Sequence, residues 1–258
     1  MKWLLTLLAA GLLAPLAEAQ RTVADSLYRA GNEAYRQNEF QQARAAYRAI
    51  LDSTALESAA LHYNLGNAYY QTGQLGRAIL HYRRSLALQP GREAVAHNLA
   101  MARERRVDTF ESLPPNLFEG AYRALMRWLR PATWAYLALL GTLLLGLGLG
   151  FYFYSRWLRP GFIAASAGLL LSLGGLGMVY ASENFRQTHQ PAVVLSASSY
   201  AKAGPSEDAP DAFVLHEGSE VIVLNRLDAW RKVRLPDGKV GWLRREDLGL
   251  VEQAQEMP

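Results

Sequence analysis

Two apolar stretches decide the architecture that this sequence predicts: ATWAYLALLGTLLLGLGLGFYFY at 132–154 and GFIAASAGLLLSLGGLGMVYA at 161–181. Neither contains a charged residue. At about 1.5 Å per residue, each would form a helix of about 30 Å, which is the thickness of a bilayer core. Backbone amides in lipid must be satisfied within their own segment, so both stretches should be helices. Only residues 155–160 separate them, and we therefore expect a transmembrane hairpin whose outer ends leave the membrane on the same side.

The two segments have the composition of an anchor. Neither contains Asp, Glu, Lys, Arg or His, which a proton relay or an ion path normally needs. Gly146 and Gly150 form one pair of small residues four positions apart, and Gly168 and Ser172 form another. Such pairs allow two helices to approach closely. We expect them to pack the two helices against each other rather than against a partner.

The start of the chain, residues 1–19, has the features of a secretory signal peptide. Lys2 precedes an apolar core at 3–16, and Ala17-Glu18-Ala19 fits the small-x-small cleavage pattern. An uncleaved anchor is the alternative. The chain has no cysteine, which excludes disulfides and thiolate metal sites. Its net charge of +4 is spread out, without the basic run that would indicate a nucleic-acid partner.

Residues 22–106 contain an internal repeat. Equivalent residues recur 35 positions apart: Gly31, Asn32, Tyr35, Phe40, Ala43 and Tyr47, then Gly66, Asn67, Tyr70, Leu75, Ala78 and Tyr82. A partial third copy follows, in which Tyr63-Asn64-Leu65 returns as His97-Asn98-Leu99. This spacing resembles the tetratricopeptide repeat, whose unit is two helices around a short turn. The resemblance implies an all-α solenoid with turns at 37–39 and 72–74, closed by a polar capping helix at 93–106.

In this repeat family, the first helix of each pair lines the concave side of the array. The repeat positions therefore imply a partner-binding face of Tyr28, Asn32, Tyr35, Arg36, Tyr63, Asn64, Asn67, Tyr70, Asn98, Met101 and Arg105. Side-chain amides can donate to and accept from a peptide backbone, and tyrosines offer rigid contact area with a polar tip. The alternative is that Asn32 and Asn67 only cap internal turns.

The same positions indicate what kind of segment would bind. Some members of the family clamp a partner's terminal carboxylate with cations beside such asparagines. Here Tyr28, Ala94 and Asn98 stand at those positions. This departure favours an internal or extended partner segment over a chain terminus.

Residues 107–130 connect the repeats to the first apolar stretch. Leu113-Pro114-Pro115 should stop any helix. Apolar residues at helical spacing follow, from Phe118 to Leu129, with arginines opposite them. They predict either an interfacial helix on anionic headgroups or simply the beginning of the first membrane helix.

Residues 188–250 change to short segments rich in β-forming residues. The expected strands are 193–195, 213–215, 220–227, 230–235 and 239–243. Asp237-Gly238 is a strong hairpin turn. Together with Gly204-Pro205 and the run Leu215-His216-Glu217-Gly218, this order resembles a bacterial SH3 domain, a small five-stranded all-β barrel. Trp230 and Trp242 would then either line a ligand groove or be partly buried residues of the barrel.

The sequence carries no recognisable catalytic motif. The five histidines lack the spacing of metal ligands, and the glycine-rich runs lie in the apolar stretches rather than in a phosphate-binding loop. No serine has the context of a nucleophile elbow. We therefore expect a protein without enzymatic activity, cofactor or metal.

The segments in order make this a multidomain membrane protein, and that order resembles the BatE family of the Bacteroides aerotolerance operon. The resemblance implies a multi-pass protein of the inner membrane with both soluble domains in the periplasm. It also implies protein partners with von Willebrand factor A domains, gathered by a scaffold for aerotolerance or envelope stress. The alternative is a module that binds peptidoglycan through the SH3-like domain. Because the hairpin separates the barrel from the repeats, we expect the two soluble domains to be independent.

Overall fold

The computed structural model describes residues 2–54, 56–111, 120, 131–154, 158–188 and 190–252. They fall into two compact units, one within Met1–Glu111 and Gln190–Pro258, the other within Ser112–His189. Apart from residues 107–111 and Gly120, the expected linker at 107–130 lies outside the described residues.

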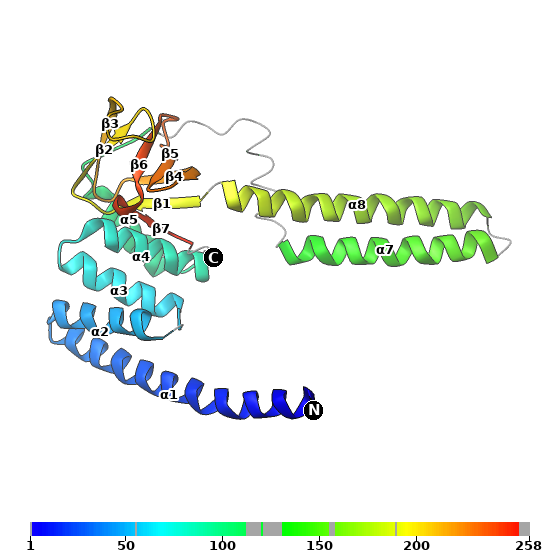
Figure 1. The fold of residues 1–258 in the computed structure, drawn as a ribbon, viewed down its shortest axis with the longest axis horizontal. Coiled ribbons are helices and arrows are strands. Elements are labelled where there is room, and N and C mark those ends of the chain that lie inside the picture. Colours follow the sequence, from blue (N-terminus) through cyan, green and yellow to red (C-terminus); the bar gives the residue numbers. More distant parts are fainter. Residues whose placement is uncertain are drawn as a thin grey trace. The chain divides into compact units, whose positions relative to one another are not determined.

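Helices of the first unit form the repeat array, and Figure 1 shows α1 to α4 stacked in chain order. The helices are α1 (Lys2–Arg36), α2 (Phe40–Ser53), α3 (Ala59–Gln71), α4 (Leu75–Leu88) and α5 (Glu93–Glu104). The turns predicted at 37–39 and 72–74 separate the helices of each pair. α1 runs without a break from the expected signal segment into the first repeat, and cleavage at position 19 stays a prediction.

The two turns use the same backbone conformation at equivalent positions. Gly73 has φ +76° and Asn38, 35 residues earlier, has φ +61°. Glycine enters this left-handed region without steric cost, and asparagine is one of the few other residues that tolerate it. The asparagine in the first copy is therefore a working substitute for the turn glycine of the second.

Small residues allow the helices of each pair to approach closely. A Cβ added to Gly31 would lie 2.5 Å from the ring of Tyr47, and one added to Gly66 would lie 2.7 Å from the ring of Tyr82. Ala78 is fully buried at the same crossing. The two tyrosine rings thus fill the space that the glycines leave, and the core of the array is built from this repeated contact.

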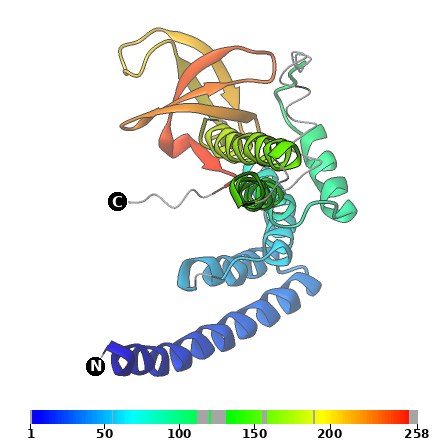
Figure 2. The ribbon, with the colours of Figure 1, turned by 90° about the vertical axis from the view of Figure 1, so that its right-hand side faces the viewer.

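The rest of the first unit is an antiparallel sheet, seen in Figure 2 as strongly curved strands coloured yellow to red. Its strands are β1 (Gln190–Val194), β2 (Ser198–Lys202), β3 (Asp211–His216), β4 (Glu220–Leu227), β5 (Trp230–Arg234), β6 (Val240–Arg244) and β7 (Leu248–Leu250). The strands pair in the order β3-β2-β6-β5-β4-β1-β7. The hairpin turn predicted at Asp237-Gly238 joins β5 to β6.

The prediction of a closed five-stranded barrel is wrong on two counts. The sheet has seven strands, and β3 and β7 are its open edges. β2 was missed because it buries only Ser199 and Ala201, a weak alternating pattern. β7 was missed because three residues are too few for a pattern to be recognised.

The sheet packs on the last repeat helices, which corrects our expectation that the two soluble domains are independent. Val193 and Val251 belong to the apolar core of the repeats. A Cβ added to Gly76 of α4 would lie 2.6 Å from the carbonyl oxygen of Val194, and one added to Gly249 of β7 would lie 2.5 Å from Leu80. Since α4 has an apolar outer face that α5 does not cover, β1 and β7 complete the burial of that face.

Charged side chains hold the same interface. The Glu220 carboxylate accepts from Arg103 Nε at 2.7 Å and lies 3.4 Å from Arg83 Nε and 3.5 Å from Arg106 Nη1. The expected polar cap is therefore wrong in one respect, because Arg103 and Arg106 face the β domain rather than solvent. Asp108 also binds this domain, accepting the backbone N–H of His216 at 2.7 Å.

The second unit consists of α7 (Pro131–Tyr154) and α8 (Leu158–Thr188), which pack side by side. Both are long and apolar enough to cross a membrane. α8 continues beyond the predicted 161–181, because the helix outlasts its apolar run.

The glycines at the α7–α8 contact are only partly those we expected. Gly168 and Ser172 of α8 lie at the contact, since a Cβ added to Gly141 of α7 would come within 2.7 Å of Gly168 and 2.5 Å of Ser172. Cβ atoms at Gly146 and Gly150 would meet open space. The close contacts recur every seven residues, at Gly141 and Gly148 of α7 and at Gly161, Gly168 and Gly175 of α8. Gly146 and Gly150 do not fall on this period.

Candidate functional site on the concave face of the repeats

Asn32 lies at the centre of a hydrogen-bond network between three helices. Its Oδ1 accepts from Tyr47 Oη of α2 at 2.7 Å and from Asn64 Nδ2 of α3 at 3.1 Å. Asn64 Nδ2 also donates to Tyr28 Oη at 2.9 Å. The side-chain oxygen of Asn32 is therefore fully used inside the protein.

The same network recurs one repeat later. Asn67 Oδ1 accepts from Tyr82 Oη of α4 and from Asn98 Nδ2 of α5, both at 2.9 Å, and Asn98 Nδ2 also donates to Tyr63 Oη at 3.3 Å. Neither Asn32 nor Asn67 caps a turn, so that alternative is wrong. We call the two networks together the asparagine ladder, made of Tyr28, Asn32, Tyr47, Asn64, Tyr63, Asn67, Tyr82 and Asn98.

At Asn32 and Asn67 the internal hydrogen bonds use the amide oxygen and leave the amide donors for a partner. In the described part of the chain, the Nδ2 groups of Asn32 and Asn67 have no protein acceptor. Burial raises the pKa of Tyr47 to about 12 and raises that of Tyr82 as well. Both hydroxyls thus keep their protons and fix the orientation of the asparagine amides.

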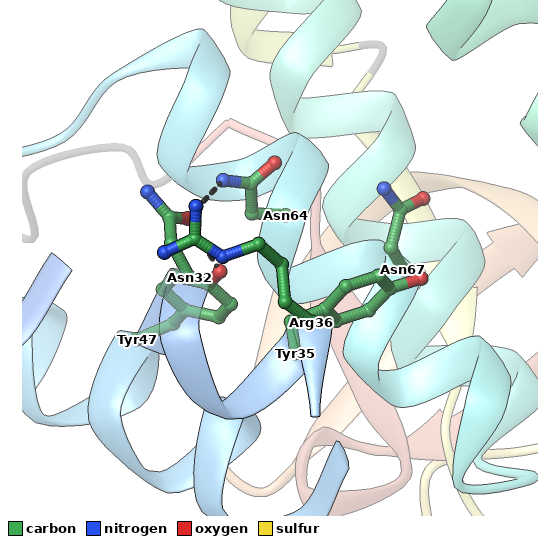
Figure 3. A pocket seen from close by; sticks show the side chains of 6 residues that line it. All are labelled: Asn32, Tyr35, Arg36, Tyr47, Asn64 and Asn67. Carbon is green, nitrogen blue, oxygen red and sulfur yellow. Dashed lines mark hydrogen bonds between the residues drawn. The ribbon is translucent and has the colours of Figure 1, made fainter. Parts of the chain in front are cut away.

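A pocket of about 290 Å³ opens over the first half of the ladder (Figure 3). It is lined by Asn32, Tyr35, Arg36, Tyr47, Asn64 and Asn67. Arg36 is largely exposed and pairs with Glu33 of its own helix. From the sequence, Tyr47 was identified only as a repeat position and not as a residue of the binding face, but its Oη reaches the concave face. The recurrence of tyrosine fifteen residues after Asn32 and again after Asn67 was the signal for it.

The remaining predicted residues lie further along the same face. Arg105 places its guanidinium carbon 5.0 Å from the ring centroid of Tyr70. Met101 is 42% exposed. None of the eleven predicted residues is fully buried, and five of them line the first pocket.

A second pocket, of about 260 Å³, lies between the repeats and the sheet. It is lined by Tyr70, Gly73, Leu75, Arg105, Val107, Ala197, His216 and Glu217. Two of these, Tyr70 and Arg105, were predicted as groove residues. Ala197, His216 and Glu217 were missed because the repeat pattern carries no information about the β domain. Gly73, Leu75 and Val107 were missed because they lie in the turn between α3 and α4, at the start of α4 and after α5, rather than on the first helix of a pair.

Trp230 and Trp242 lie half-buried on one outward face of β5 and β6. In the strand register Trp230 is opposite Arg244, whose guanidinium lies 5.9 Å from the Trp230 ring centroid, and Trp242 is opposite Lys232. This register makes Trp230 and Trp242 diagonal neighbours on the same face, a separation that aromatic side chains can span. The pair forms a flat aromatic and basic patch, and both tryptophans are partly buried as well.

Two histidines of the repeats form a buried pair. His62 Nδ1 lies 2.9 Å from His81 Nδ1, and the His81 ring also stacks on Tyr69. Burial lowers the pKa of both, and the positive charge of Arg84 lowers them further, while Glu57 partly opposes the shift at His62. The pair is therefore neutral at neutral pH and contributes to the core rather than to the concave face.

Residues 28–93 match the family model described as Tetratricopeptide repeat. The repeat array is of this type. No curated protein matches the chain. The match covers α2, α3 and α4 and the part of α1 that carries Tyr28 and Asn32. It therefore includes most of the concave face, while Asn98, Met101 and Arg105 lie beyond it. Such an array indicates a scaffold for protein–protein interaction.

Proposed function

We propose that this protein is a non-catalytic, membrane-anchored scaffold whose concave face holds an extended segment of a partner protein. The asparagine ladder carries this proposal. It fixes two asparagine amides, one repeat apart, with their donors available for the carbonyl groups of a bound backbone. Since internal hydrogen bonds already orient these amides, little side-chain entropy is lost on binding.

The proposal places the protein in the inner membrane, with both soluble domains in the periplasm. A signal peptide at 1–19 would deliver the repeats, and a hairpin of 132–154 and 161–181 would return the chain to the same side. The packing of β1 and β7 on α4 supports this, because two domains in contact must share one side of the membrane. Arg156 and Arg159 between the spans favour a cytoplasmic turn.

The order of the segments supports a BatE-like role within an aerotolerance or envelope-stress complex. The partners would then be proteins with von Willebrand factor A domains.

Site-specific photo-crosslinking in native membranes tests the groove. A photoreactive amino acid at position 36, in the first pocket, is expected to capture one defined partner. The same probe at position 48 is the control, because Arg48 lies on α2 and pairs with Asp52 outside the pocket. Adding Tyr35→Ala should reduce capture from position 36. Equal capture from both positions, or none from position 36, would contradict the proposal.

A second candidate function is peptidoglycan binding through the β domain. The outward patch of Trp230, Trp242 and Lys232 favours it, since aromatic faces with adjacent cations suit glycan rings and acidic stem peptides. Retention of the full chain on insoluble peptidoglycan, lost with Trp242→Ala but kept with Val240→Ala, would support it. Unchanged retention in both variants would exclude this patch.

A further inference from the structure

The second pocket is built jointly by the repeats and the β domain. Tyr70, Leu75 and Arg105 form its wall on the repeat side, while Ala197 and His216 belong to the β domain. Tyr70 and Arg105 also belong to the predicted concave face. The pocket is thus an extension of the partner groove with a wall that the repeats do not supply.

Hydrogen bonds across the interface fix the wall from the β domain. Glu217 Oε1 accepts the backbone N–H of Gly76 at 2.8 Å, in the first turn of α4. Gln74, the N-cap residue of α4, makes no side-chain capping bond, so Glu217 supplies it from another domain. His216 is held through its N–H and its Nδ1, at 2.7 and 2.8 Å from the Asp108 carboxylate. The pocket is therefore formed before any ligand arrives.

Arg105 contributes a guanidinium group to the lining of this pocket. Among the described residues, no carboxylate forms an ion pair with Arg105, whose guanidinium lies over Tyr70. Two acidic groups lie near the pocket, and both have partners. The charge of Glu217 is directed to the positive N-terminus of α4, and Asp108 binds His216 and Ser219. A guanidinium held against an aromatic ring is a suitable receptor for a carboxylate, because it offers paired N–H donors in one plane.

We propose that this pocket binds an aspartate or glutamate side chain of the partner segment, so that the repeats and the β domain recognise the partner together. The inference rests on the proposed function of the groove. A side chain is the expected source of the carboxylate rather than a chain terminus, because Tyr28, Ala94 and Asn98 replace the cations of a terminal clamp.

The test uses the full chain in nanodiscs and a random peptide array with amidated C-termini, duplicated with free C-termini. Bound amidated peptides should share one acidic position. Changing that residue to Gln or Asn should weaken binding at least about tenfold, the value of a charge-assisted hydrogen bond. Ala197→Trp, which fills the pocket from an exposed position, should cause a similar loss.

With Arg105→Gln, a peptide with the acidic residue and the same peptide with Gln or Asn at that position should bind with equal affinity. Arg77→Gln is the matched control, because that guanidinium also lies over a tyrosine, 6.0 Å from the Tyr69 ring, but outside the pocket. Peptides that bind without an acidic preference, or only with free C-termini, would overturn this inference and leave the groove proposal intact. An array that retains no peptide would overturn both.

Discussion

Replacing Glu220 with glutamine is expected to lower the free energy of unfolding by about 2–3 kcal/mol. Its carboxylate is 19% exposed and faces three arginines, the nearest at 2.7 Å. Removing one partner of a buried ion pair costs about 3–5 kcal/mol, because the other charge stays without compensation. Arg83 and Arg103 are more than a third exposed, so solvent screens part of that loss. We therefore expect a loss of about 2–3 kcal/mol, at or just below the lower limit of that range.

The pH dependence of the same contact gives a second readout. Burial alone would raise the pKa of Glu220, but the hydrogen bond and charge of Arg103, with the charges of Arg83 and Arg106, lower it below its ordinary 4.5. A lowered folded-state pKa means that the stabilisation is complete above pH 4.5 and is lost as the pH falls further. The Glu220→Gln variant should lack this acid-dependent loss.

The assay is urea unfolding of the full chain in nanodiscs, combined with amide hydrogen exchange in α5 and β4. Glu246→Gln is the control, because Glu246 pairs with Arg244 on the surface and its loss should cost less than about 0.5 kcal/mol. A Glu220→Gln variant within about 0.5 kcal/mol of wild type, with unchanged exchange in α5, would refute the docked arrangement of the two domains.

Substitutions within the repeats test the hydrogen-bond networks, the shared core and the buried histidines. Tyr82→Phe removes one donor to Asn67 and should lower the free energy of unfolding by about 0.5–1.5 kcal/mol. Tyr47→Phe should cause about the same loss. Unequal losses in urea unfolding would contradict the equivalence of the two networks. Ala78→Leu overfills a packed contact and should lower the free energy of unfolding by about 1–3 kcal/mol. Because β1 packs on α4, hydrogen exchange should increase in both elements. An increase confined to α4 would contradict the shared core. Because the pKa values of His62 and His81 lie below 6.5 in the folded state, the unfolded chain binds more protons as the pH falls below 6.5. Stability should therefore decrease there by up to about 1.4 kcal/mol per pH unit per group, and His81→Phe should flatten this slope.

The sequence was sufficient for the repeats because their period is local and is carried by strongly restricted residues. Gly31 and Gly66 identify the helix crossings, and the 35-residue period places each turn. The positions of Asn32 and Asn67 on the first helix of each pair were also predictable. The hydrogen-bond partners of Asn32 and Asn67 could not be predicted. The sequence shows which side chains share a face, but not which of them bond to one another.

The docking of the β domain could not be predicted from the pattern of either domain alone. In the sequence, Glu217 and Glu220 are charged residues beside or at the start of an expected strand, and Arg103 falls within the expected capping helix at 93–106. Their contacts join segments more than 110 residues apart across the membrane hairpin. Only the unexplained apolar residues Ile79 and Leu80 on the outer face of α4 indicated that something should cover that helix.

The most direct test of the central claim is the affinity of the captured partner segment for the full chain in nanodiscs. We compare wild type with a Tyr35→Ala, Arg36→Ala double variant, which changes the first pocket without removing a ladder residue, and with Arg48→Ala as the control. We expect a Kd at least about tenfold weaker for the double variant and an unchanged Kd for the control. Equal affinity for all three would contradict the assignment of the concave face as the partner site.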